Sequence, residues 1–162
     1  MVTRPNAAFP APLPPGLTPH SVGSMRATSL TLVFTNAAGE LLTHPAGYAV
    51  LRYRAGTWGV AELARLLTST GALLLGNRWQ RLLADARLLP PLSPEAKAWI
   101  TANWMGPTRL RPEQLHTVVL QPAEVFARLA ASQMQALAPH ATRYHHCPDE
   151  AAAHACLLGL PR

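Results

Sequence analysis

Short apolar runs alternate with amphipathic stretches from Tyr48 to the C-terminus, and Pro or Gly marks the turns between them. Strands that alternate with helical stretches of about ten to fifteen residues are typical of crossover units, which build a parallel sheet. Leu82–Ala84 is apolar on both sides, which predicts a central strand covered on both faces. The apolar runs are Tyr48–Tyr53, Leu82–Ala84, Thr117–Leu120 and Thr142–Tyr144.

The segment before Tyr48 has a different pattern. Leu30–Thr35 and Glu40–Thr43 predict two short strands, and Gly-containing turns join them to each other and to Tyr48–Arg54. Such closely spaced strands favour an antiparallel meander. The sequence therefore predicts an α/β fold with a small mixed sheet, an antiparallel meander followed by parallel crossover units, and about four helices.

Helix starts are indicated by capping residues. Thr57 is the predicted N-cap of a helix that runs to about Leu75. Ser93 precedes Pro94 and Glu95, so a hydroxyl cap, a proline at the first helical position and an acid in the first turn coincide. The alternative interpretation of Ser93 is a phosphorylation site at a helix N-terminus.

Residues 1–26 are rich in proline, which predicts a disordered tail. Two alternatives are that translation begins at Met25 and that the tail is a polyproline ligand for a partner. Residues 27–160 are expected to form a single domain.

The formal net charge of +6 raises the question of nucleic-acid binding. Lys97 is the only lysine beside many arginines, and aromatic residues amount to 6% of the chain, so few side chains could stack on bases. These features argue against nucleic acid as a partner. With no apolar run of about 20 residues, no secretory pattern and two cysteines, we expect a cytoplasmic protein without a membrane span or a disulfide framework.

Motifs of common catalytic sites do not occur in the sequence. It lacks the phosphate-cradling glycine loops and the Gly-x-Ser-x-Gly nucleophile elbow. Five potential zinc donors lie near the C-terminus, but their spacing fits no structural zinc knuckle, so we expect surface histidines, packed thiols and no metal. These donors are His145, His146, Cys147, His154 and Cys156.

Asp85 is the most informative polar residue because it ends the predicted central strand. In open α/β sheets, ligands bind at the carboxyl edge of the strands. Asp85, Arg87, Gln121 and Trp104 are therefore the candidate residues for binding a ligand or partner. In the structural alternatives, Asp85 accepts backbone N–H groups or pairs with Arg87, and Trp104 packs in the core.

Several strings resemble the bacterial STAS-like fold family, which includes small proteins described as STAS or CRAL-TRIO-like. The resemblance covers roughly Leu30 to Leu158, and it implies a small sheet with packed helices, no catalytic activity and a regulatory binding role. In relatives that antagonise anti-sigma factors, a serine after the central strand is phosphorylated, whereas Asp85 to Ser93 contains an additional proline-rich loop here. The strings are Leu82–Arg87, Trp99 with Trp104, Val118–Pro122, and Tyr144 followed by Pro148–Glu150.

Three hypotheses for the function follow. The leading one is a non-enzymatic regulatory module that binds a protein partner or a small apolar ligand and needs no cofactor. The second is a carrier of a lipid or small molecule. The third is an enzyme that uses Asp85 with a histidine such as His116, although His116 opens its strand and is expected at the opposite end from Asp85. The oligomeric state is left open, with a weak dimer as one alternative.

Overall fold

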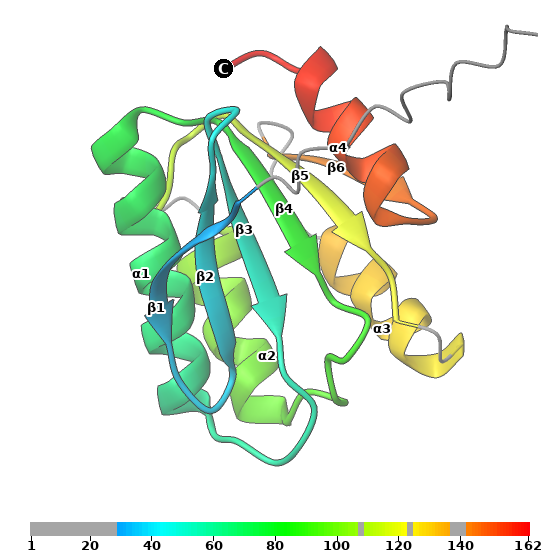
Figure 1. The fold of residues 1–162 in the computed structure, drawn as a ribbon. Coiled ribbons are helices and arrows are strands. Elements are labelled where there is room, and N and C mark those ends of the chain that lie inside the picture. Colours follow the sequence, from blue (N-terminus) through cyan, green and yellow to red (C-terminus); the bar gives the residue numbers. More distant parts are fainter. Residues whose placement is uncertain (1–28, 107–108, 123–124, 137–141) are drawn as a thin grey trace, which may run out of the picture.

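The computed structural model describes residues 29–106, 109–122, 125–136 and 142–162. Its centre is one six-stranded sheet in which the strands lie in the order β1-β2-β3-β4-β5-β6 (Figure 1). The predicted tail, residues 1–26, lies outside the described residues.

The sheet is mixed, as predicted. β1 and β2 pair antiparallel, as do β2 and β3, and every later neighbour pair is parallel. β4 therefore lies inside the parallel part, and four of its five residues, Arg81 to Ala84, are buried. The strands are β1 (Thr31–Thr35), β2 (Gly39–His44), β3 (Tyr48–Tyr53), β4 (Arg81–Asp85), β5 (Leu115–Leu120) and β6 (Thr142–Cys147).

Helices cover both faces of the sheet. The helical segments are α1 (Val60–Asn77), α2 (Pro94–Ile100), the π-helical turn η1 (Thr101–Met105), α3 (Val125–Ala136) and α4 (Glu150–Gly159). Residues of α1, α2 and η1 pack on one face, whereas Ala153 and Leu157 of α4 pack on the other. Right-handed crossovers that step in a constant direction place their helices on one face, which accounts for α1, α2 and η1 lying together, whereas α4 follows the last strand and is not part of a crossover. No helix within the described ranges is both long and apolar enough to cross a membrane.

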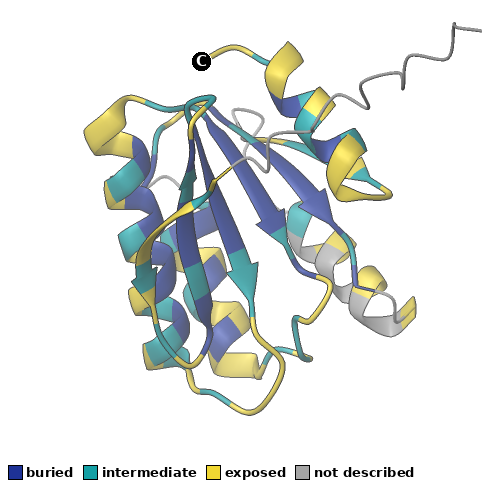
Figure 2. Ribbon diagram, in the orientation of Figure 1, coloured by how far each residue is buried: buried dark blue, intermediate teal, exposed yellow. Residues whose placement is uncertain are grey.

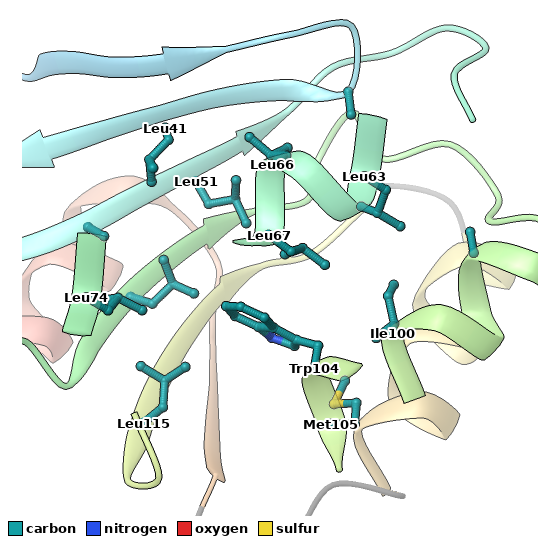
Figure 3. Close-up of a cluster of buried hydrophobic side chains, with 14 residues drawn as sticks. Leu41, Leu51, Leu63, Leu66, Leu67, Leu74, Ile100, Trp104, Met105 and Leu115 are labelled. Atoms are coloured by element: carbon teal, nitrogen blue, oxygen red, sulfur yellow. The ribbon is translucent and has the colours of Figure 1, made fainter. Parts of the chain in front are cut away.

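The larger core lies between α1 and the sheet (Figures 2 and 3). Four leucines of α1 point towards the strands because their spacing puts them on one side of the helix. They meet Leu41 of β2 and Leu51 of β3, and every one of these side chains is almost completely buried. The four are Leu63, Leu66, Leu67 and Leu74.

The two predicted caps have different outcomes. Ser93 is the N-cap of α2, and its Oγ accepts the backbone N–H of Ala96 at 3.2 Å. Thr57 is not a cap, because α1 begins after Gly59 and Glu62 reaches back to accept the Gly59 N–H at 3.0 Å. An acid at the third helical position thus stabilises the helix start without a hydroxyl at the cap.

α2 continues into the π-helical turn η1, which buries Trp104 and Met105 together. The carbonyl of Trp104 accepts a hydrogen bond from Nε of Arg111 at 2.6 Å, and the Arg111 guanidinium lies 6.0 Å from the Trp104 ring centre. Trp104 is only 6% exposed. The ring therefore packs in the core, as the structural alternative expects, and its role in binding a ligand or partner stays a prediction.

Candidate functional site

The edge after β4 holds a network of charged side chains. Asp85 receives two hydrogen bonds from the Arg87 side chain, Nε to Oδ1 at 2.9 Å and Nη2 to Oδ2 at 2.7 Å. The Arg87 backbone N–H also donates to Oδ1, at 3.2 Å. Arg87 reaches further to Oε1 of Glu150 at the start of α4, at 2.6 Å. This network ties the loop after β4 to α4.

The electrostatics of Asp85 fit that structural role. Burial by itself raises the pKa of its carboxyl group, but the hydrogen bonds and the charge of Arg87 outweigh burial and hold the pKa below its usual value. The carboxylate is therefore ionised at neutral pH and already occupied by donors. A group in this state is a poor general base, because its proton affinity is low.

Gln121 lies at the same edge of the sheet. It follows β5, whose last residue Leu120 pairs with Asp85. The Gln121 side-chain amide donates to Nδ1 of His146 at 2.8 Å. The structure therefore brings Asp85, Arg87 and Gln121 to one edge, but it engages each of them with another side chain.

His116 lies at the opposite end of the sheet from Asp85. In the parallel register it pairs with Arg81, the first residue of β4, while Asp85 is the last. Four strand residues span about 13 Å, well beyond hydrogen-bond reach. The structure therefore contradicts a pair of Asp85 and His116. His116 instead contacts His145, with Nδ1 and Nε2 3.4 Å apart.

A cavity of about 130 Å³ lies between the sheet and the helices α1 and α2. Its wall is mostly apolar and includes Leu51, Leu67 and Trp104. The proline-rich loop after Asp85 closes one side through residues 89–92, so the cavity lies directly beneath the predicted edge. Apolar cavities of about 150 Å³ stay dry and bind benzene-sized molecules.

Polar side chains also line this cavity, namely those of Tyr53, Lys97, Thr117, Gln135 and Tyr144. Thr117 of β5 lines it and is 5% exposed, yet its hydroxyl has no hydrogen-bond partner within the described part of the chain. Tyr144 also lines the cavity, and its hydroxyl donates to the sulfur of Met105 at 3.0 Å, a weak acceptor. Burial raises the pKa of Tyr144 to about 12, so the hydroxyl keeps its proton at neutral pH.

The C-terminal histidines and cysteines do not converge. Across the described ranges, no group of three or more His, Cys, Asp or Glu side chains is arranged to hold a metal ion. Cys147 and Cys156 pack against the second core, and burial, together with the neighbouring Cys156 thiol, raises the pKa of Cys147. Both cysteines are free.

The residues that the sequence analysis missed have no distinctive local signal. Thr117 is β-branched, as strand residues commonly are, so its position in β5 needs no functional explanation. Tyr144 lies in the short strand β6, and the residues that it contacts are known only from the fold. His44, Tyr48 and His154 form a separate cluster from distant parts of the chain, and of these only His154 was considered from the sequence as a candidate site residue, namely as a metal donor. Only the three-dimensional arrangement brings these residues together.

Comparison with known proteins identifies no relative of this chain. No protein-family model, no curated protein and no solved structure matches this chain.

Proposed function

We propose that this protein is a non-enzymatic regulatory binding module of STAS-like type, and that a small apolar ligand occupies the 130 Å³ cavity. The observation that carries the proposal is a largely apolar cavity with one buried hydroxyl, that of Thr117, which has no partner among the described residues. An unpaired buried hydroxyl costs free energy, and a bound ligand with one hydrogen-bonding group would supply the missing partner. The strings that resemble the STAS-like family support the non-catalytic class.

The size of the cavity limits the ligand. A volume of about 130 Å³ suits one aromatic ring or a short branched chain. Pockets for drug-sized ligands measure about 300–1,000 Å³, so a lipid with long acyl chains would not fit inside. This argues against the lipid-carrier alternative and leaves small apolar molecules as the ligand class.

The state of Asp85 supports a module without catalysis. Its carboxylate is held by three hydrogen bonds from Arg87, and His116 lies at the far end of the sheet. An enzyme built on Asp85 would need a base that is free to accept a proton. Binding of a protein partner stays a prediction from the sequence.

The first test measures whether toluene stabilises the protein against thermal unfolding. Ligand at ten times its Kd adds about 1.4 kcal/mol to the free energy of unfolding, which raises Tm by about 3–6 °C. Ala84 lines the cavity and is buried, so Ala84→Leu fills the space and should abolish the rise. The control Ala72→Leu makes the same change at an exposed position of α1 and should keep it. A toluene effect of equal size in Ala84→Leu would refute the proposal.

The second test examines whether the hydroxyl of Thr117 forms a hydrogen bond with the ligand. Thr117→Val has nearly the same shape, so it should bind toluene as the wild type does. It should bind benzyl alcohol about tenfold more weakly than the wild type, because one hydrogen bond is lost. An unchanged affinity for benzyl alcohol would show that Thr117 does not contact the ligand.

A further inference from the structure

Three aromatic side chains form a polar cluster on the sheet face opposite the apolar cavity. His44 ends β2, Tyr48 begins β3, and His154 comes from α4. The rings of His44 and Tyr48 stack with their centres 4.3 Å apart, and His154 lies 4.8 Å from His44. The hydroxyl of Tyr48 is 2.6 Å from Nδ1 of His154.

The hydrogen bonds at the two Nδ1 atoms bear on where the imidazole protons lie. Nδ1 of His44 accepts the backbone N–H of Ala46 at 3.0 Å, so the neutral ring carries its proton on Nε2. Burial raises the pKa of Tyr48 to about 12, against the opposing charge of Arg81, so the phenol keeps its proton at neutral pH and can donate it to Nδ1 of His154. With Tyr48 as the donor, the neutral His154 ring carries its proton on Nε2. In this arrangement, both rings offer an Nε2–H group to a ligand.

These two rings line a hollow of about 300 Å³. Its apolar part is formed by Leu30, Val50 and Leu83, and its polar part includes Arg52 besides the histidines. Such a volume lies at the lower end of the range for small-molecule sites. The hollow can therefore hold a ligand with an apolar body and one polar group.

The charges around the hollow favour an anion. Arg52 makes no ion pair with a carboxylate of the described residues, although its charge contributes to the low pKa of Asp85. Glu150 also lines the hollow, but its carboxylate already accepts from Arg87 at 2.6 Å. Behind Tyr48, the buried guanidinium of Arg81 donates to three backbone carbonyls and to no described carboxylate. Cationic and N–H donor groups thus exceed the free acceptors.

We propose that this hollow binds a small organic anion whose carboxylate is held by Arg52 and the Nε2–H groups of His44 and His154. The apolar body of the anion rests on Val50 and Leu83. Charge-assisted hydrogen bonds from a guanidinium and two imidazoles are the interactions that proteins use for carboxylates. The site differs from the apolar cavity in face, size and charge, so it extends the function beyond binding of an apolar ligand.

The test titrates the full chain with benzoate and follows the side-chain nitrogen resonances of His44 and His154 by NMR. Benzoate should shift both Nε2 resonances with a saturable curve. Benzyl alcohol has the same ring without the charge, and inorganic phosphate has the charge without the ring, so both should bind at least about tenfold more weakly. No saturable shift up to about 20 mM benzoate, or equal binding of benzyl alcohol, would overturn the proposal.

A pair of arginine variants separates a site from a general charge effect. Arg52→Gln removes the cation of the hollow and should weaken benzoate binding about tenfold or more. Arg54→Gln removes the same charge two residues later, from an exposed side chain that pairs with Glu40 outside the hollow. It should leave the affinity within about twofold of the wild type. Equal losses in the two variants would show that benzoate senses only the net charge. The backbone NMR spectrum of each variant checks that the fold is retained.

Discussion

Two glycines of α1 should respond in opposite directions to the same substitution. A Cβ at Gly71 would overlap the carbonyl oxygen of Leu110, and the carbonyl carbon of Leu110 would lie only 2.7 Å away. A Cβ at Gly76 would have no atom within 4 Å. Gly71→Ala therefore forces α1 away from the loop before β5, while Gly76→Ala only changes the chain's conformational freedom.

The expected changes in the free energy of unfolding combine a gain from replacing Gly with Ala in a helix and a cost from overpacking. Replacing Gly with Ala inside a helix gains about 1 kcal/mol at both positions, or less near the helix end. Overpacking costs about 1–3 kcal/mol, and Gly71 falls at the upper end because a backbone carbonyl cannot rotate away as a side chain can. We expect Gly71→Ala to lower the free energy of unfolding by about 2 kcal/mol and Gly76→Ala to raise it by about 0.5 kcal/mol.

Urea denaturation followed by circular dichroism measures both values. The urea midpoint should fall for Gly71→Ala and rise slightly for Gly76→Ala, with the slope m unchanged because the same surface is exposed on unfolding. If Gly71→Ala were as stable as the wild type, the close packing of α1 against Leu110 would be refuted.

Three further predictions concern stability. Ser93→Ala removes the acceptor for a backbone N–H in the first turn of α2, so the urea midpoint should fall by an amount worth about 1 kcal/mol, and an unchanged midpoint would exclude the cap. Burial, followed by the neighbouring His145, lowers the pKa of His116, so the unfolded chain takes up the proton first and the protein should lose stability as the pH falls below about 6.5. His116→Gln should reduce this loss between about pH 7 and pH 5 in the same assay; an identical pH profile would contradict the assignment. Arg87→Ala should cost less than about 1 kcal/mol, because the side chains of Arg87 and Glu150 are about half exposed, at 46% and 56%, and a larger fall in the free energy of unfolding would contradict this weak contribution.

The layout of the sheet could be predicted from the sequence, because the residue patterns that indicate each strand are local. Leu82–Ala84 is apolar at successive positions, which requires cover on both faces, and β4 is indeed central. The start of α1 was missed because Glu62 supplies the stabilising contact in place of a hydroxyl at Thr57. The π-helical turn was missed because the apolar spacing that ends at Trp104 suits an α-helix equally well.

The candidate sites were harder to predict from the sequence, because the state of each side chain depends on residues that only the fold brings close to it. Asp85 and Arg87 are two residues apart, so their pairing could be proposed as an alternative from the sequence alone. The missing partner of Thr117 is a property of its surroundings and not of its strand. Tyr48 and His154 are 106 positions apart, and no local pattern connects them.

The order of the strands bears on how the protein is made. Each strand after β1 pairs with the one that precedes it in the chain, and within the described part of the chain no later strand inserts between two earlier ones. During synthesis the N-terminal part emerges from the ribosome first. Each new strand therefore finds its neighbour already translated, and the sheet can grow in one direction while the remainder of the chain is still inside the exit tunnel.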